Sequence, residues 1–221
     1  MQDNQGPLTD NAEPSTPRWA RKPFVSGHGR AMVAIGFLAL SIVVSLLTIT
    51  IVHDYFFIGV SPITIGGSLL SAAVGTGCVV SFLLWFRRVY RNLPAIGAEG
   101  LAHSPGSAVA WWFVPLAQFW KPLKVATEIW HASDRTAVRN DDLARHARPM
   151  PALLAVWWMA WLSALVLGTF IAGPDRVHYQ GYVVTTGILI ATVYDILAAA
   201  LAMAVILEID RRQSSQQSKG G

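Results

Sequence analysis

The sequence has little charge and a single cysteine, and each shortage excludes a class of protein. Charged residues make up 14% of the 221 residues, whereas a soluble domain carries roughly 25%, so an ordinary soluble domain is a poor match. Cys78 has no second cysteine with which to form an intrachain disulfide or a thiolate metal site. Its place inside an apolar run favours a packed small side chain over a reactive thiol.

Recognisable catalytic motifs are also missing. The sequence contains no glycine-rich phosphate loop, no HExxH zinc motif and no G-x-S-x-G nucleophile turn. The six histidines fall in expected loops, interfaces or the N-terminal segment, and no two have a spacing that demands a metal ion. The sequence therefore predicts no catalytic residue, no metal site and no cofactor.

What the chain has instead is long apolar runs. Hydrophobic residues make up 53% of the sequence, and a bilayer core about 30 Å thick needs roughly 20 helical residues to cross it. Four runs meet this length, at about 31–52, 63–86, 152–172 and 182–207. We therefore predict an all-α integral membrane protein, a bundle of four transmembrane helices. Residues 1–30 and 211–221 are polar and are predicted to be a disordered arm and a disordered tail, so the membrane domain covers 31–210.

The second apolar run carries small residues at helical spacing. Gly67, Ser71 and Gly75 lie at i, i+4 and i+8, and small residues on one face let helices approach closely in lipid. This pattern predicts a packing seam, either within one chain or between the copies of a homo-oligomer.

The segment 107–133 is apolar but too interrupted to span. Its uncharged part ends at Trp120, and Pro115 and Pro122 each remove a helical hydrogen bond. The residues after Pro122 alternate in the pattern of a short amphipathic helix lying in the membrane interface. We predict a proline-broken re-entrant or interfacial element that returns to the side from which it enters.

The distribution of basic residues supports this topology. If 107–133 returns and both termini are cytoplasmic, sixteen of the seventeen basic residues are cytoplasmic and Arg176 alone lies outside. A full crossing would leave eight inside and nine outside, against the positive-inside rule. We therefore predict a multi-pass plasma-membrane protein whose basic cytoplasmic face meets anionic lipid headgroups. A nucleic-acid partner is not expected, because the basic residues lack stacking platforms away from lipid.

Several residues near this basic face resemble a known bacterial membrane family. They are Trp85, Arg88 and Asn92, the WWFVP run from Trp111 to Pro115, Pro122, the EIW run from Glu128 to Trp130, and the closing EIDRRQ. The pattern resembles the family catalogued as domain of unknown function 4328, which is common in actinobacteria. The resemblance covers roughly 31–213. It implies a bacterial membrane protein with several membrane helices and implies no activity.

The matching residues form a candidate site at the cytoplasmic face. The cluster comprises Trp85, Arg88, Asn92, Pro115, Pro122, Glu128 and Trp130. Its first three members lie at i, i+3 and i+7, on one stripe of the second helix. We expect Arg88 to pair with Glu128 and Asn92 to cap broken backbone near Pro115 or Pro122, because unsatisfied backbone groups in hydrocarbon are costly. The cluster either locks the returning element in place or binds a ligand or headgroup.

Asp195 lies near the middle of the fourth apolar run. Acidic residues inside a membrane are costly and suggest a functional site. Ser41 and Ser45 in the first run lie at a similar depth, together with Thr48, and predict a polar cluster with Asp195. Two interpretations stay open: a carboxyl group that is hydrogen-bonded to hydroxyls and joins helices, or a proton or cation relay.

The sequence does not specify a biochemical activity. It favours a non-enzymatic membrane interaction, sensor or accessory module, whose partners are the anionic bilayer and a second membrane protein or a second copy. One alternative is a small transporter or channel subunit that uses Asp195. The other is a lipid-modifying enzyme at the membrane interface that uses Glu128 or His131.

Overall fold

The computed structural model describes residues 19–58, 61–134, 149–171 and 181–217, and within these ranges every regular element is a helix. The elements in chain order are α1 (His28–Ile58), α2 (Pro62–Asn92), the 3₁₀ turn η1 (Pro94–Ile96), α3 (Pro105–Ala110), the 3₁₀ turn η2 (Ala117–Phe119), α4 (Lys121–Ala132), α7 (Ala152–Ile171) and α8 (Gly181–Gln217). The predicted all-α class is confirmed.

Four of these helices, α1, α2, α7 and α8, are long and apolar enough to cross a membrane. The 20 residues of α7 make a helix about 30 Å long, which matches the hydrocarbon core of a bilayer. The 31 residues of α2 and the 37 residues of α8 reach about 46 and 55 Å, so both helices project beyond the bilayer. The chain is therefore a multi-pass membrane protein.

Two helices begin with the same local signal, a serine followed by a proline. The Ser61 hydroxyl accepts a bond from the Thr64 main-chain N–H, and the Thr64 hydroxyl accepts one from the Ser61 N–H. Ser104 and Ser107 make the same reciprocal pair at the start of α3. Proline suits the first helical position because its φ is already helical and the N–H it lacks would have no helical partner there.

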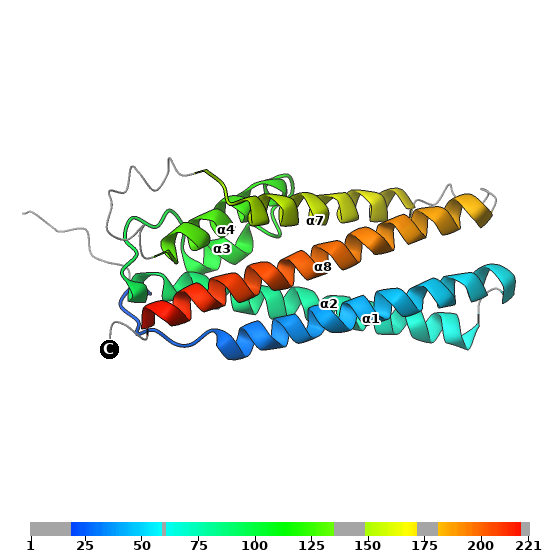
Figure 1. The fold of residues 1–221 in the computed structure, drawn as a ribbon, viewed down its shortest axis with the longest axis horizontal. Coiled ribbons are helices and arrows are strands. Elements are labelled where there is room, and N and C mark those ends of the chain that lie inside the picture. The colour runs from blue at the N-terminus through cyan, green and yellow to red at the C-terminus, as the bar shows by residue number, and fades with distance from the viewer. Residues whose placement is uncertain (1–18, 59–60, 135–148, 172–180, 218–221) are drawn as a thin grey trace, which may run out of the picture.

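The four long helices form an incomplete ring. α1 packs against both α2 and α8, and α8 packs against α7. Figure 1 shows α7 and α8 lying together above α1 and α2. The order around the bundle is therefore α2, α1, α8, α7. The first and last helices of this series approach each other through Phe82 and Trp157, whose ring centroids are 6.0 Å apart.

The close approach of α1 to α2 occurs at Gly77. A Cβ atom at this position would overlap the ring of Phe37 on α1, so only glycine fits without a shift. Gly75 of the predicted seam does not pack within the chain, because an added Cβ there would meet nothing within 4 Å; a seam between two copies stays a prediction. The small-residue spacing was identified correctly, but α1 packs against a different stripe of α2.

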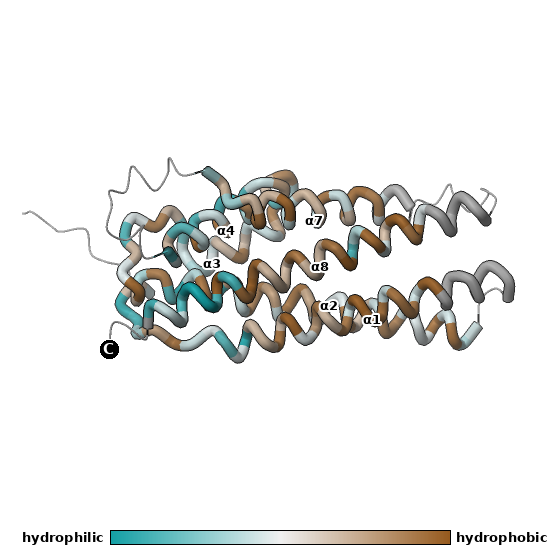
Figure 2. The backbone as a smooth tube through the Cα atoms, viewed as in Figure 1, coloured by the Kyte–Doolittle hydropathy of each residue, from teal (hydrophilic) through white to brown (hydrophobic). Residues whose placement is uncertain are grey.

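Polar residues gather at one end of the bundle, where α1 begins and where α2, α4 and α8 finish (Figure 2). We call this the basic end. Its described arginines are Arg21, Arg30, Arg87, Arg88, Arg91, Arg211 and Arg212. The most completely buried large side chains also lie here, among them Trp85, Tyr90, Leu93, Ile129 and Ile209. The basic end is thus a packed unit with its own core, continuous with the membrane helices.

The predicted disorder of the chain ends is wrong for the residues nearest the bundle. Trp19 packs against Tyr90 with ring centroids 6.4 Å apart, and α1 starts at His28, three residues before the predicted span. At the other end α8 continues through Gln217. Residues 1–18 and 218–221 lie outside the described ranges. Tertiary contacts at the basic end order segments whose composition alone predicts disorder.

Candidate functional site

The segment that contains α3 and α4 is a hairpin whose two ends meet at Tyr90. The Tyr90 hydroxyl oxygen accepts a 2.9 Å bond from the main-chain N–H of His103, just before α3. The same hydroxyl lies 3.1 Å from Oε2 of Glu128, near the end of α4. Because both ends lie against one side chain of α2, the segment returns to the end of the bundle where it began. This confirms the predicted broken element, and among the described residues this segment does not cross to the opposite end of the bundle.

The tip of the hairpin turns at Leu116. This residue has φ = 63°, the one positive φ among the described non-glycine residues, and the Ala117 N–H donates to the Pro115 carbonyl at 2.8 Å. These values define a tight three-residue turn that is rare because it is strained. The predicted break at Pro115 is therefore a full reversal of the chain.

The tip lies beside the membrane-spanning part of α7. The indole N–H of Trp158 donates to the Phe119 carbonyl at 3.1 Å, and Trp158 is six residues, or about 9 Å, into α7. The side chains of Phe113 and Leu116 are 67% and 70% exposed. Exposed apolar side chains at this depth fit hydrocarbon rather than water.

Trp112 joins the hairpin to two membrane helices. Its indole ring has centroid distances of 5.4 and 5.9 Å to Phe82 and Phe86 on α2, and of 5.8 and 5.7 Å to Trp158 and Trp161 on α7. All four contacts are near edge-to-face, the geometry that aromatic quadrupoles favour. Trp112 of the WWFVP run therefore packs between α2 and α7.

Glu128 does not pair with Arg88, so the predicted ion pair is wrong. Its Oε1 accepts a 2.7 Å bond from the Ala102 N–H, and its Oε2 lies 3.0 Å from Nδ1 of His103. Tyr90 and Arg88 are two positions apart, which places them about 200° apart around α2. The hairpin contacts the Tyr90 side, so Arg88 faces away from Glu128.

Asn92 caps backbone, but not the backbone that was predicted. Its Nδ2 donates to the Val25 carbonyl at 2.9 Å, and its Oδ1 accepts a long 3.5 Å bond from the Val25 N–H. The residue therefore fixes the extended segment before α1, rather than Pro115 or Pro122 of the hairpin. Pro122 is buried in α4, and the described hydrogen bonds give neither proline a contact with Asn92.

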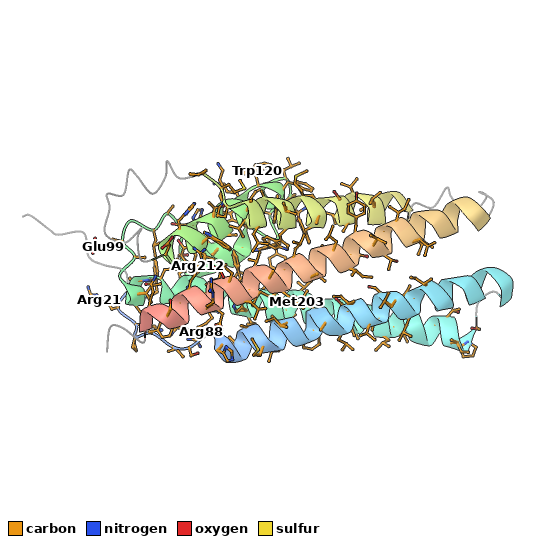
Figure 3. All side chains as sticks on the ribbon, in the orientation of Figure 1. Arg21, Arg88, Glu99, Trp120, Met203 and Arg212 are labelled. Carbon is orange, nitrogen blue, oxygen red and sulfur yellow. The ribbon has the colours of Figure 1, made fainter. Side chains whose placement is uncertain are left out.

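Four arginines gather on one face of the basic end. Leu84, Arg87, Arg88 and Arg91 follow the i, i+3, i+4, i+7 spacing of a single helix face. Arg30 of α1 reaches this face and donates to the Leu84 carbonyl at 3.3 Å, and it lies within electrostatic range of Arg88, as does Arg91. We call Arg30, Arg87, Arg88 and Arg91 the arginine cluster; Figure 3 shows Arg88 beside the first turn of α1.

The arginine cluster has no carboxylate of its own among the described residues. Nε of Arg88 is buried without a hydrogen-bond partner there. Three nearby acids already have other partners: Glu208 pairs with Arg211 and Arg212 at 2.8 Å, Asp210 with His28 at 2.8 Å, and Glu128 with His103. No ion pair among the described residues therefore joins the arginine cluster to a carboxylate.

Trp130 makes a cation–π contact with Arg212, which is not a member of the arginine cluster. The guanidinium of Arg212 lies 4.2 Å from the Trp130 ring centroid, and Arg212 also pairs with Glu208. This contact joins α4 to the end of α8, between which Figure 3 shows Arg212. Trp85 is fully buried in the core. Both tryptophans therefore have buried, structural positions.

A cavity of about 680 Å³ lies between the four membrane helices. It brings together the predicted intramembrane residues Ser41, Ser45 and Asp195, as well as Thr48. The predicted hydrogen bonds between Asp195 and these hydroxyls are absent from the described structure. Ser41 donates instead to the Leu38 carbonyl of its own helix at 2.7 Å. These residues therefore line one cavity, but no described hydrogen bond joins Asp195 to the hydroxyl groups of the other helices.

Tyr90 and His103 are the site residues that sequence reasoning missed. Tyr90 is not among the predicted site residues, and His103 was grouped with the histidines that carry no predicted function. The described residues include no group of three or more histidine, cysteine, aspartate or glutamate side chains placed to hold a metal ion.

Comparison with curated proteins and with solved structures finds no match. The family profile described as Domain of unknown function (DUF4328) matches residues 62–211. The match runs from the first residue of α2 into the last turns of α8, and it includes the hairpin, the arginines of α2 and Asp195. α1 lies outside the match, so the resemblance expected from residue 31 onward is narrower than predicted. The chain belongs to the DUF4328 family.

Proposed function

We propose that this chain is a non-enzymatic membrane module, a sensor or accessory protein that binds anionic lipid headgroups through the arginine cluster. The observation that carries the proposal is the set of four arginines without a paired carboxylate among the described residues. Like charges on one helix face repel each other, and the phosphate of a headgroup relieves that repulsion with charge-assisted hydrogen bonds.

The position of the cluster supports a lipid ligand over a soluble anion. Arg87 directly follows the apolar part of α2, and the neighbouring Leu84 is exposed. Arginine stems cover apolar surface while their guanidinium groups reach the headgroup layer. Juxtamembrane basic residues each contribute about 1 kcal/mol of attraction to an anionic leaflet. We therefore place the basic end at the cytoplasmic leaflet of the plasma membrane, with both termini in the cytoplasm, as the positive-inside rule requires.

A membrane-interface enzyme is less well supported. Glu128 accepts hydrogen bonds from the Ala102 N–H and lies within hydrogen-bond distance of Tyr90 and His103. A carboxylate with these partners serves to hold the hairpin and is poorly placed to act as a general base. A transporter or channel subunit has one observation in its favour, because Asp195 lines the intramembrane cavity.

The proposal is tested by lipid selectivity. The full chain is reconstituted in nanodiscs of phosphatidylcholine with a minority of phosphatidylglycerol, and the lipids retained by the protein are quantified by native mass spectrometry. We expect Arg87→Gln/Arg88→Gln/Arg91→Gln to lose the enrichment of phosphatidylglycerol. The double variant Arg87→Gln/Arg91→Gln leaves the half-buried Arg88 in place and should lose most of it.

The matched control is Arg211→Gln. It removes one charge from the same end of the bundle, but Arg211 already pairs with Glu208 at 2.8 Å. Phosphatidylglycerol enrichment should survive this change. Equal enrichment in the wild type and in the α2 variants would refute the headgroup site.

A further inference from the structure

The intramembrane cavity is a second site, separate from the arginine cluster. All four membrane helices contribute to its lining, and its volume of about 680 Å³ falls within the roughly 300–1,000 Å³ of small-molecule pockets. Aromatic side chains from α2, the hairpin and α7 line part of it; they are Phe82, Trp112, Phe113, Trp157 and Trp161. An apolar body of moderate size fits such a lining.

The hydroxyl groups of the lining present acceptors rather than donors. Four of them share one pattern, in which the hydroxyl donates its proton to a carbonyl oxygen of its own helix at 2.7–2.9 Å. They belong to Ser41, Thr48, Ser71 and Thr192. A hydroxyl oxygen has two lone pairs in addition to its proton. The wall therefore favours a ligand that donates hydrogen bonds.

Asp195 adds a charge to this acceptor-rich wall. Among the described residues that line the cavity, it is the one carboxylate, and none of the others is a basic residue. Its side chain is exposed, and the described hydrogen bonds and ion pairs give it no partner. Glu208 is the next charged residue toward the basic end, thirteen residues or about 20 Å away along α8. An ionised carboxylate at this depth needs a counter-ion, because no water is present in hydrocarbon to solvate it.

The lining also leaves room beside the carboxylate. Ala198, Ala199 and Ala202 follow Asp195 on α8 and line the same cavity. Across the cavity, Gly75 on α2 has nothing within 4 Å of an added Cβ. The three alanines leave space next to Asp195 on α8, and Gly75 leaves space on the α2 part of the lining.

We propose that this cavity binds a hydrophobic organic cation, an amphiphile with one ammonium group on an apolar body, and that Asp195 is its counter-ion. The N–H groups of the ammonium donate hydrogen bonds to the hydroxyl oxygens. Its single positive charge balances the one carboxylate. The apolar body lies against the aromatic side chains, whose ring faces also attract cations. This site is independent of the headgroup site on the arginine cluster.

The test uses dodecylamine, which is protonated at neutral pH, and dodecanol, which has the same chain and no charge. The full chain is placed in nanodiscs of phosphatidylcholine, and binding is measured as a concentration-dependent rise in Tm. We expect dodecylamine to raise the Tm of the wild type, and dodecanol to raise it little. In Asp195→Asn the apparent affinity for dodecylamine should fall by at least about tenfold. Asp195→Glu should retain binding.

A matched pair of glycine substitutions tests the cavity itself. Gly75→Leu adds a large side chain to the lining of the cavity, whereas Gly36→Leu adds the same side chain on α1 outside the lining; neither added Cβ meets an atom within 4 Å. The first should abolish the dodecylamine effect and the second should preserve it. Equal Tm shifts by the amine and the alcohol would identify a site for neutral chains and refute the proposal. An unchanged affinity in both Asp195→Asn and Gly75→Leu would refute it as well.

Discussion

The side-chain amide of Gln213 on α8 donates a 3.1 Å hydrogen bond to the main-chain carbonyl of Val89 on α2. The same Nε2 lies 3.2 Å from the Ser133 hydroxyl at the end of α4. The Val89 carbonyl lies in the last turn of α2, where the Leu93 N–H bonds to Tyr90 instead, so this carbonyl lacks its helical partner. One buried amide therefore completes α2 and connects it to both α4 and α8.

Replacing Gln213 should loosen the basic end. In Gln213→Leu the Val89 carbonyl and the Ser133 hydroxyl lose their partner in a buried setting, which costs about 1–3 kcal/mol per unsatisfied group. We expect a lower Tm in detergent, measured by tryptophan fluorescence. Ser214→Ala, at an exposed neighbouring position of the same helix, should leave Tm unchanged. A Tm for Gln213→Leu equal to that of this control would contradict the role of the amide.

The Tyr90–Glu128 contact predicts a measurable coupling. A double-mutant cycle with Tyr90→Phe and Glu128→Gln should give an interaction free energy of about 0.5–3 kcal/mol, as expected for residues that share a hydrogen-bond network. The same cycle with Arg88→Gln and Glu128→Gln should be additive within about 0.5 kcal/mol. Chemical or thermal unfolding of the four variants in detergent measures both. Coupling in the Arg88 cycle and none in the Tyr90 cycle would restore the original ion-pair hypothesis.

We expect position 77, inside the membrane, to tolerate no side chain larger than that of glycine without a loss of stability. Gly77→Ala places a methyl group against the ring of Phe37, so α1 and α2 must separate or the ring must move. We expect a Tm below that of wild type, and partial recovery when Phe37→Leu is added. Gly36→Ala is the control, because a Cβ there meets nothing within 4 Å. Full tolerance of Gly77→Ala would show that α1 packs elsewhere on α2.

The membrane spans were predictable because the bilayer imposes a simple requirement. Each crossing needs about 20 apolar residues in a helix that satisfies its own backbone, and this requirement is visible in local sequence. The broken hairpin was predictable for the same reason, because Pro115 and Pro122 leave no uninterrupted helix of that length. Neither prediction depended on which helices are neighbours.

The contacts of the basic end depend on tertiary neighbours and were mostly missed. The sequence places Arg88 and Asn92 against the hairpin, but the hairpin contacts Tyr90, which lies between them in sequence and on another face of α2. Nothing local to α2 distinguishes these faces, since both carry side chains capable of hydrogen bonding. The helical end of α8 was missed for a similar reason, because Gln213 and Gln216 are ordered by bonds to Val89 and Ser133.

The sequence predicted which residues belong to the intramembrane cluster, but not that they line a cavity instead of bonding to one another. Similar depth in the bilayer correctly grouped Ser41, Ser45 and Asp195. Whether such residues touch or face one another across a space depends on how far apart the helices stand. That distance is set by contacts elsewhere, such as Gly77 against Phe37 and Trp112 between α2 and α7.

The last prediction concerns the membrane topology, and the structure identifies exposed positions at which cysteines can test it. In a Cys78→Ala background, single cysteines replace Ser26 before α1 and Ser214 near the end of α8, both exposed at the basic end. Ser133 is unsuitable because it is 1% exposed and would be shielded in any orientation. We expect both cysteines to resist an impermeant maleimide in intact cells and to react after permeabilisation. Ser61→Cys, at the opposite end of α2, should react in intact cells. Labelling of Ser26 and Ser214 from outside would invert the orientation and remove the cytoplasmic headgroup site, whereas labelling of only one would contradict the even number of crossings.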